Sequence, residues 1–481
     1  MNEKVNKITV KRGDSIKQTM RTIDREGLGI AFIVDENNKF LGLVTDGDIR
    51  RAILSGINIE KTSIEQVMNR NPIFVKREWS REKLQNFLQS SKILSMVSIY
   101  EAMKIPVLSE NEQVVDILYL SKKKSEEIEK PSIRIEYETQ ETRPVNKVLV
   151  IGGAGYLGSI LCRKLLDRGY TIRVLDNLMY GDEGIRDLYN HPNFEFVKGD
   201  MRNLQIVMKC LKGMDAVIHL AAIVGDPASA LNPQDTIEIN YLSTKLIAEV
   251  CKYYQINRFL FASTCSVYGV SPTPKVRINE ESLLNPVSLY AEMKLKSEKG
   301  ILELIDENFS PTILRMATLY GLSPRMRFDL VVNLLTAKAV IDKKITIFGG
   351  DQWRPNLHVK DAAEAYIKCL EAPISKVSGE IFNVGSNDQN YQIKEIGEMI
   401  NSIIPEAEII IDKENIDRRD YNVAFDKIKE VLNYKTKYTI KDGAIEIIDE
   451  IRKGRINDYT NSKYSNYKYL EQEKEKRKDT G

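Results

Sequence analysis

The sequence predicts an α/β protein built on a doubly wound parallel sheet, preceded by a smaller α/β module. Short apolar runs alternate with helix-like segments from residue 147 to about residue 455, which is typical of parallel strands joined by helices. The first of these runs, residues 148–151, opens into closely spaced glycines. A second alternation of shorter elements fills residues 1 to about 123.

The composition is ordinary for a soluble globular protein. The 481 residues leave room for two or three domains, and 42% of them are apolar and 29% charged. Basic residues exceed acidic ones by only two (70 against 68), so no global charge favours nucleic acid or an anionic membrane as a partner. Five scattered cysteines and three histidines form no zinc pattern, and the odd cysteine count suits a reducing compartment. No apolar run is long enough for a membrane span and the charged start does not resemble a signal peptide, so we expect a cytoplasmic protein that binds small molecules and no metal.

We divide the chain into four parts. Residues 1–123 form the N-terminal module, and residues 124–145 are a charged, proline-punctuated linker. Residues 146–456 form the main α/β domain, which ends in a small C-terminal subdomain. The charged, tyrosine-rich tail at residues 457–481 has no apolar period, so we expect it to be disordered or weakly docked.

The N-terminal module contains two similar halves. The first half has an apolar strand at residues 31–36 and a hairpin strand that ends in Thr45-x-x-Asp48. With residues 105–118 as the second copy, the module resembles a pair of CBS repeats. That resemblance implies that Thr45 and Asp48 hold the phosphate and ribose of an adenosine nucleotide. The second half lacks the Thr-x-x-Asp motif, so at most one nucleotide site is expected; alternatively the module only dimerises, and Asp48 caps the helix that follows.

A dinucleotide-binding turn is predicted at residues 148–158. Its glycine spacing is GxxGxxG rather than the more common GxGxxG. Gly152 and Gly155 have no side chains, so the backbone can turn tightly and approach a pyrophosphate, while Gly158 allows close helix packing. The following helix then directs its N-terminal amides at the phosphates.

A carboxylate ends the second apolar run of this domain. Asp176 follows residues 171–175 and lies about 20 residues past the turn, where it would accept hydrogen bonds from ribose hydroxyls. No arginine directly follows Asp176, which favours NAD over NADP because a carboxylate repels the extra phosphate of NADP. The alternative is that Asp176 is only a solvated residue at a strand end.

A tyrosine and a lysine four residues apart on one helix face form the expected catalytic pair. This spacing occurs at Tyr100, Tyr119, Tyr241, Tyr290, Tyr459 and Tyr464. Only Tyr290 with Lys294 lies downstream of a strand that ends in a cluster of hydroxyl residues, which includes Thr264. An ammonium group stabilises a phenolate, so the pair can accept the proton of an alcohol, and Thr264 would hydrogen-bond the same oxygen.

Together these segments resemble the extended short-chain dehydrogenase/reductases, specifically the NAD-dependent epimerase/dehydratase family. The resemblance covers about residues 146–434 and includes GDMR at residues 199–202, HLAA at 219–222, LRMATLYG at 314–321 and RPNLHVKD at 354–361. It implies a Rossmann-type fold, bound NAD and a nucleotide-sugar substrate. Besides the three glycines, Asp176, Tyr290 and Lys294, it implies a cofactor site lined by Tyr156, Leu157, Asn177, Asp200, Met201, Leu220, Ala221 and Ala222.

The same resemblance assigns residues to the substrate. Arg354 and Arg419 would clamp the diphosphate, for which a planar guanidinium is suited; otherwise they are solvated surface residues. Thr318 stands where the family has a substrate-contacting asparagine, which changes how the sugar is oriented. His219 is expected to pack at a strand end rather than to act as an acid or base.

The two residues that follow Thr264 reduce the number of reactions that the family resemblance allows. Family dehydratases follow the catalytic threonine with Asp-Glu, whereas Cys265 and Ser266 follow it here, so elimination lacks its proton donors. The cysteine that one epimerase branch uses as a ring-carbon base corresponds to Ser266. We therefore expect Cys265 to pack as a small apolar residue.

The resemblance implies an NAD-dependent epimerase of nucleoside-diphosphate sugars that acts at C4 through a transient 4-keto sugar, like UDP-glucose 4-epimerase. The alternatives are a nucleotide-sugar 4-dehydrogenase/reductase or 4,6-dehydratase, and a non-catalytic sensor of NAD or adenosine nucleotides. Helices at residues 236–254 and 287–304 correspond to the family's dimer interface. We therefore expect a homodimer, which pairing of CBS modules would extend to a tetramer.

Overall fold

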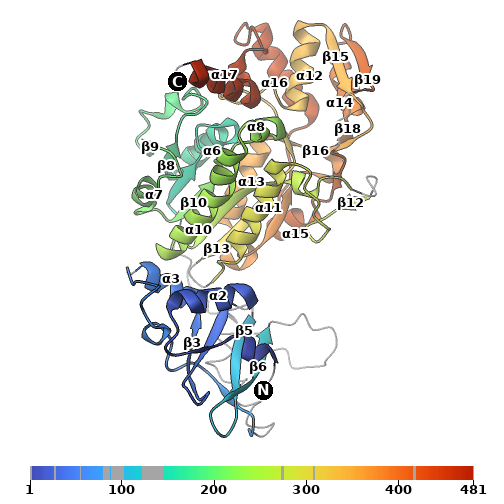
Figure 1. Cartoon of the computed structure of the whole chain (residues 1–481). Coiled ribbons are helices and arrows are strands. Elements are labelled where there is room, and N and C mark those ends of the chain that lie inside the picture. Colours follow the sequence, from blue (N-terminus) through green and yellow to red (C-terminus); the bar gives the residue numbers. More distant parts are fainter. Residues whose placement is uncertain are drawn as a thin grey trace. The chain divides into compact units, whose positions relative to one another are not determined.

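The protein consists of two compact units, Met1–Ile135 and Glu136–Gly481, which are coloured along the sequence in Figure 1. The computed structural model describes residues 3–26, 29–54, 56–79, 87, 102–121, 145–271, 276–306, 309–414 and 419–479. The boundary between the units falls within the predicted linker, of which residues 124–144 lie outside the described part.

The smaller unit contains two three-stranded sheets of the same design. In each sheet the middle strand pairs in parallel with the preceding strand and antiparallel with the following one. The strands are β1 (Thr9–Lys11), β2 (Ile30–Val34) and β3 (Phe40–Thr45), then β4 (Val75–Lys76), β5 (Ala102–Leu108) and β6 (Val114–Ser121). The described helices are α1 (Glu3–Lys7), α2 (Ile16–Glu26), α3 (Asp46–Leu54) and the 3-10 turn η1 (Ile64–Gln66). This repetition matches the internal repeat seen in the sequence.

The larger unit is built on a seven-stranded, wholly parallel sheet in the order β17-β13-β11-β10-β7-β8-β9. Its strands are β7 (Lys147–Ile151), β8 (Thr171–Asp176), β9 (Phe194–Lys198), β10 (Ala216–His219), β11 (Arg258–Thr264), β13 (Ser310–Met316) and β17 (Ile381–Val384). The chain runs outward from β7 to β9 and then returns to the other side of β7. This reversal confirms the doubly wound fold and predicts a ligand crevice at the carboxyl ends of β7 and β10.

Helices cover both faces of this sheet because alternate side chains of its strands point to opposite sides. Val148 and Val150 pack with the helices of one face, and Leu149 and Ile151 with those of the other. The first face carries α6 (Tyr156–Asp167) and α13 (Val359–Glu371); the second carries α7 (Leu204–Leu211), α10 (Thr244–Tyr253) and α11 (Leu289–Leu302). Within the described residues, no helix combines the length and apolarity needed to cross a bilayer.

A small subdomain packs around its own apolar core near the C-terminus. Its elements are α12 (Val331–Ile341), β15 (Lys344–Phe348), α14 (Ile393–Asn401), β19 (Glu408–Asp412) and α16 (Ile440–Arg452), and β14 (Thr318–Tyr320), β16 (Trp353–His358) and β18 (Asn390–Gln392) form a separate sheet. The remaining elements of the unit are η2 (Arg186–Leu188), α8 (Asp226–Leu231), α9 (Pro233–Ile237), the π-helix η3 (Glu238–Ser243), η4 (Cys265–Tyr268), β12 (Arg277–Ile278), η5 (Ile374–Lys376), η6 (Asn387–Gln389), β20 (Asn422–Val423), α15 (Asp426–Leu432), η7 (Ser462–Tyr464) and α17 (Asn466–Asp479).

The tail differs from the expectation of disorder or weak docking. Tyr459 and Tyr464 pack edge-on against Phe328, with ring centroids 6.1 and 5.3 Å apart, and α17 begins at the buried Asn466. Isolated tyrosines provide this apolar contact, and isolated residues leave no helical or strand period in the sequence.

A partly buried cluster of His358, Lys360 and Glu446 in the subdomain predicts acid sensitivity. Burial alone would raise the pKa of Glu446, but hydrogen bonds from His358 (3.2 Å) and Lys360 (2.6 Å) outweigh it and hold the pKa at about 2. Because this pKa is depressed in the folded state, the stabilisation is complete above about pH 5 and is lost as the pH falls toward 2. In the wild type this carboxylate should make the free energy of unfolding about 2–3 kcal/mol larger at pH 7 than in acid. Glu446→Gln should abolish that difference, measured by urea titration between pH 3 and 7. Asp449→Asn, on the exposed side of α16, is the matched control and should keep the wild-type pH dependence.

Candidate active site

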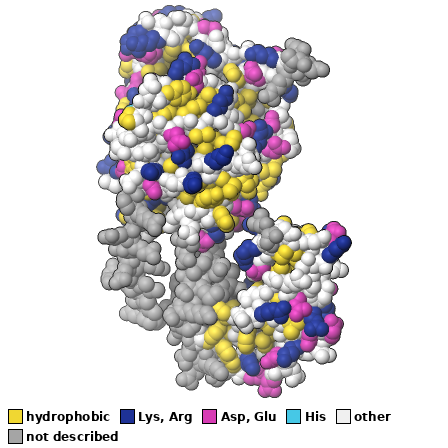
Figure 2. Space-filling view, turned by 90° about the vertical axis from the view of Figure 1, so that its left-hand side faces the viewer, with side chains coloured by type: hydrophobic (Ala, Val, Ile, Leu, Met, Phe, Trp, Pro, Cys, Tyr) yellow, Lys and Arg dark blue, Asp and Glu magenta, His cyan; other side chains and the backbone are white. Residues whose placement is uncertain are grey.

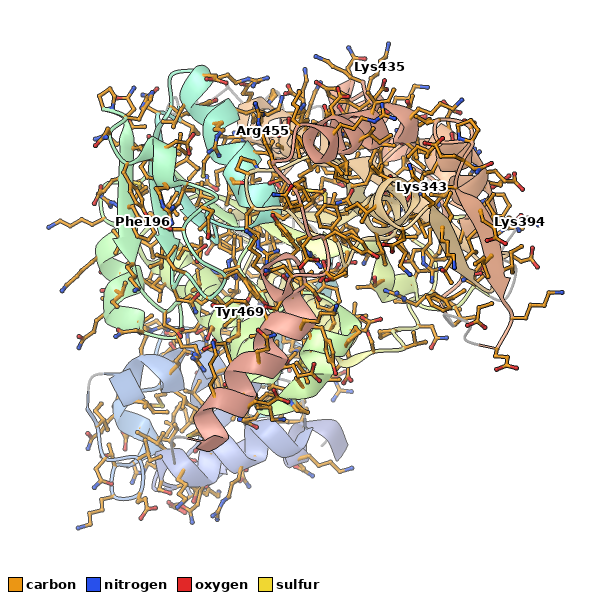
Figure 3. The ribbon with its side chains drawn as sticks, turned by 90° about the horizontal axis from the view of Figure 1, so that it is seen from above. Phe196, Lys343, Lys394, Lys435, Arg455 and Tyr469 are labelled. Carbon is orange, nitrogen blue, oxygen red and sulfur yellow. The ribbon has the colours of Figure 1, made fainter. Side chains whose placement is uncertain are left out.

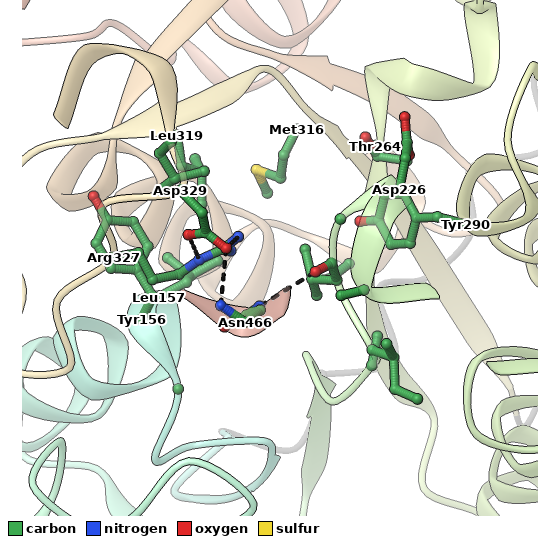
Figure 4. Close-up of a pocket in the computed structure, with 18 of the residues that line it drawn as sticks. Tyr156, Leu157, Asp226, Thr264, Tyr290, Met316, Leu319, Arg327, Asp329 and Asn466 are labelled. Atoms are coloured by element: carbon green, nitrogen blue, oxygen red, sulfur yellow. Dashed lines mark hydrogen bonds and ion pairs between the residues drawn. The ribbon is translucent and has the colours of Figure 1, made fainter. Parts of the chain in front are cut away.

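One large cavity of about 570 Å³ lies at the carboxyl ends of the parallel strands (Figure 4). Its walls come from the ends of β7, β8, β10, β11 and β13 and from the small subdomain. We call it the main cavity. Every cofactor, catalytic and substrate residue predicted for the larger unit lines it, although these residues are spread from Gly152 to Arg419 along the chain.

The glycine turn fits a dinucleotide. Gly152 has φ +89°, and a Cβ there would lie 2.6 Å from the backbone nitrogen of Ala221; a Cβ at Gly158 would lie 2.4 Å from the carbonyl oxygen of Gly152. At Gly155 the nearest atom is 3.5 Å away, so this glycine borders open space. Gly155 also provides no side-chain cap for α6, and the first-turn amides of α6 are therefore available for a pyrophosphate.

Gly158→Ala tests this fit. The new methyl group would clash with backbone atoms of Gly152 and Gly153, which form the turn itself. NAD binding should therefore weaken at least about tenfold, measured by the NAD content of the purified protein and by titration. Gly13→Ala is the matched control, because its Cβ would meet nothing within 4 Å. Wild-type NAD affinity in Gly158→Ala would contradict the predicted role of the turn.

Asp176 lies at the end of β8 with its carboxylate on the main cavity. Its oxygens accept hydrogen bonds from the backbone nitrogens of Ala154 (3.0 Å) and Leu178 (2.9 Å). Burial raises the pKa of Asp176, and these two hydrogen bonds oppose the rise. Each carboxylate oxygen keeps a lone pair for a ribose hydroxyl, so the group fits the adenosine half of NAD.

Three side chains predicted for catalysis meet on another wall. Thr264 ends β11, and Tyr290 and Lys294 lie on the first turns of α11, whose N-cap is Ser288. Thr264 lies near the Tyr290 phenol and acts to lower its pKa. Lys294 Nζ donates to the carbonyl of Ala262 at 2.7 Å. A proton acceptor and a cation are thus held in the cavity that carries the glycine turn.

We expected Lys294 to favour the ionised form of the Tyr290 phenol, but the surroundings of the phenol favour its neutral form. Burial raises the pKa of Tyr290, and the nearby carboxylate of Asp226 raises it further, against smaller opposing effects of Arg327 and Thr264. Burial lowers the pKa of Lys294 to about 7, although Glu298 one turn away opposes this. Burial therefore opposes the charged form of both groups.

Three residues predicted to bind substrate lie on the subdomain side. Thr318 begins β14 and Arg354 is buried on β16. The Arg354 guanidinium donates to the carbonyls of Trp353 (2.7 Å) and Arg419 and lies over the Tyr421 ring at 5.4 Å. Both arginines line the main cavity, and the backbone of Arg419 anchors the Arg354 guanidinium there. Guanidinium groups are suited to binding a diphosphate.

Comparisons with known proteins identify the family. The model of the NAD dependent epimerase/dehydratase family matches residues 148–385. An uncharacterized UDP-glucose epimerase of Bacillus subtilis is 30% identical over 312 residues, which cover 62% of this chain and 95% of that protein. The chain belongs to the NAD-dependent epimerase/dehydratase family. Membership confirms the expected Rossmann-type fold and NAD as the cofactor.

The larger unit is similar to solved structures of family members. UDP-glucose 4-epimerase of Thermotoga maritima with UDP-glucose has a TM-score of 0.58 and 25% identity, and UDP-glucuronic acid 4-epimerase of Bacillus cereus with UDP-glucuronic acid and NAD has a TM-score of 0.55 and 28% identity. Each comparison covers 64% of this chain and 99% of the other. A CBS domain additionally matches residues 1–55, the first half of the N-terminal unit.

The side chains for which the sequence suggested packing are buried. Cys265 does not line the main cavity, and its thiol contacts the carbonyl of Arg315 at 3.3 Å; burial raises the pKa of the thiol. His219 Nε2 lies 2.9 Å from Thr244 Oγ1, and burial lowers the pKa of the imidazole to about 3.

Thr45 and Asp48, in the N-terminal unit, bond to each other. Asp48 Oδ2 accepts from the backbone nitrogen (2.9 Å) and the hydroxyl (2.7 Å) of Thr45, and Thr45 Oγ1 accepts from the backbone nitrogen of Asp48 (3.2 Å). This reciprocal arrangement caps α3, which agrees with the alternative that Asp48 is a helix-capping residue.

Sequence reasoning missed four charged side chains of the main cavity: Asp226, Arg325, Arg327 and Asp329. Asp226 accepts a hydrogen bond from Ser288 Oγ at 2.8 Å and pairs with Arg419 at 3.3 Å. It thereby joins the N-cap of α11 to a predicted substrate residue. Its position in the loop after β10, at the carboxyl edge of the sheet, was the one available signal.

Proposed function

We propose that this family member is an NAD-dependent nucleoside-diphosphate-sugar epimerase that inverts C4, with UDP-sugars as the first substrates to test. The observation that supports it most is that Thr264, Tyr290 and Lys294 line the same cavity as the glycine turn and the Arg354–Arg419 pair. One cavity can thus hold a nicotinamide, a sugar alcohol and a diphosphate together.

In this proposal each side chain has one task. Bound NAD would supply reversible hydride transfer at C4. The Tyr290 oxygen takes the proton of the C4 hydroxyl and later gives it back, while Thr264 orients that hydroxyl and the Lys294 ammonium favours the ionised phenol. Arg354 and Arg419 hold the diphosphate while the 4-keto sugar turns to present its other face.

Net elimination is the weaker candidate. Ser266, which lines the main cavity two residues after Thr264, has no carboxylate to move a proton, and Cys265 is buried outside the cavity. A 4,6-dehydratase would need a proton donor and acceptor at these two positions.

The test is to incubate the purified protein with UDP-glucose and UDP-glucuronic acid without added cofactor, and to follow the products by NMR and mass. Scrambling at C4 with unchanged mass is expected. A requirement for stoichiometric NAD or NADH would indicate a 4-dehydrogenase/reductase instead, and loss of water would indicate a dehydratase. Retained NAD without turnover on a wide panel of sugars would favour a non-catalytic sensor.

We further propose a homodimer through α10 and α11. Apolar side chains gather in patches on one face of the larger unit in Figure 2. On the two helices and the residues flanking them, Leu242, Leu246, Tyr253 and Val287 are exposed. Light scattering should give twice the chain mass, or four times if the N-terminal units also pair, and Leu246→Glu should shift the protein toward the monomer.

For the N-terminal unit we propose adenosine-nucleotide binding at Thr45 and Asp48. Their mutual hydrogen bonds would have to open, so affinity should be modest. Thermal stabilisation by AMP, ATP or S-adenosylmethionine that is lost in Asp48→Ala would support the site. No stabilisation by any of the three would leave capping as the role of this pair.

A further inference from the structure

The C-terminal segment contributes a residue to the main cavity. Asn466, the first residue of α17, is 4% exposed and lines the cavity together with Tyr467. In Figure 4, Asn466 lies between the Arg327–Asp329 pair and the side of the cavity that carries Tyr290. The segment lies beyond residue 385, where the match to the family ends.

Asn466 bonds to both sides of the cavity. Its side-chain nitrogen donates to the carbonyl of Val224 at 3.3 Å, in the loop between β10 and α8. Its backbone nitrogen donates to Asp329 Oδ2 at 3.0 Å, and its side-chain oxygen accepts from Arg325 Nη2 at 2.8 Å; both partners lie between β14 and α12. One amide therefore ties the loop after β10, which belongs to the sheet, to the loop that leads into the subdomain.

The helix that carries Asn466 is held in place along its length. Tyr469, labelled in Figure 3, contacts the ring of Tyr180 with centroids 5.4 Å apart. The guanidinium of Arg325 lies 4.4 Å from the centroid of the same Tyr180 ring. Lys474 Nζ donates to the carbonyl of Leu231 at the end of α8. These contacts keep the first turn of α17 across the main cavity.

We propose that Asn466 is a positioning residue that fixes the loop after β10 against the loop before α12 and so retains NAD in the main cavity. The loop after β10 includes Leu220, Ala221 and Ala222, the predicted cofactor-lining residues, and its far end is Asp226 beside Tyr290. Release of the amide bridge frees this loop, and bound cofactor then exchanges faster. The inference rests on the proposed function only in that NAD occupies this cavity; it does not depend on which sugar reacts.

The test measures exchange of bound NAD for isotopically labelled NAD, without any sugar, in the full-length protein. Asn466→Ala is expected to speed exchange at least about tenfold, since two hydrogen bonds across the cavity are lost. Lys468→Ala, an exposed change on the same helix, is the matched control and should leave the exchange rate at the wild-type value. The melting temperature of each variant, measured with saturating NAD, separates a local effect from general unfolding.

Asn466→Asp tests whether both side-chain hydrogen bonds of Asn466 are needed, or only the one from Arg325. The carboxylate keeps an acceptor for Arg325 but cannot donate to the Val224 carbonyl. Fast exchange in both variants, with melting temperatures near wild type, supports the bridge. Wild-type exchange in Asn466→Asp or in Asn466→Ala overturns the proposal, and so does an acceleration that merely follows a lowered melting temperature. Absence of epimerisation by the wild type would contradict the proposed function and leave this measurement interpretable.

Discussion

Tyr290→Phe is expected to lower the turnover of nucleotide sugar by roughly 10²–10⁴-fold, the range typical for loss of a general acid–base group. In our proposal the phenol is the proton acceptor at the wall formed by Thr264 and Lys294, and phenylalanine keeps its ring but removes the oxygen. NAD content and melting temperature should stay close to wild type, because the ring still fills the same space. Turnover is measured by NMR at saturating sugar.

Tyr241→Phe provides a matched control for this experiment. Tyr241 precedes Lys245 at the same four-residue spacing but lies on η3 and does not line the main cavity. Its turnover should remain within about twofold of wild type, because no proton transfer depends on it. Equal turnover in Tyr290→Phe and wild type would remove the proposed role of the phenol.

The second large effect concerns the buried ion pair behind the catalytic strand. Glu298 and Arg315 have side chains only 2% exposed, and Arg315 Nη2 lies 2.7 Å from Glu298 Oε2. Arg315→Met leaves Glu298 charged, buried and without its main partner. The free energy of unfolding should therefore fall by about 3–5 kcal/mol, measured by urea denaturation.

A double variant shows whether the loss comes from the uncompensated charge. Glu298→Gln combined with Arg315→Met removes both charges, so its unfolding free energy should lie well above that of Arg315→Met alone. Ser263, which directly precedes Thr264, donates a hydrogen bond to Glu298. In the double variant the side-chain oxygen introduced by Glu298→Gln can still accept this hydrogen bond. A double variant as unstable as the single one would mean that packing, rather than charge, dominates at this site.

Local motifs account for the parts of the site that sequence could predict. The turn around Gly152, the strand-end Asp176 and the pair Tyr290/Lys294 each depend on residues within one strand–loop–helix segment, so their spacing is visible in the chain. The alternation of apolar runs likewise predicted the doubly wound sheet, which the strand order confirms.

The features of the site that the sequence did not predict depend on contacts between distant segments of the chain. Asn466 reaches the cavity only because tyrosines far along the chain dock the tail, and nothing in the local pattern around it indicates a site. The charge balance at Tyr290 is equally non-local, since burial and Asp226 act on the phenol from different segments. A motif can name the reacting groups, but their proton affinities follow from the complete packing.

The helix α11 carries Tyr290, Lys294 and Glu298 at successive four-residue intervals. The proposed proton acceptor, the proposed cation beside it and the anchor of the buried ion pair therefore share one helical register of about 5.4 Å per turn. A slip of α11 by one residue would displace all three at once. A molecule folded in the wrong register would therefore lose the buried ion pair and the predicted catalytic arrangement together.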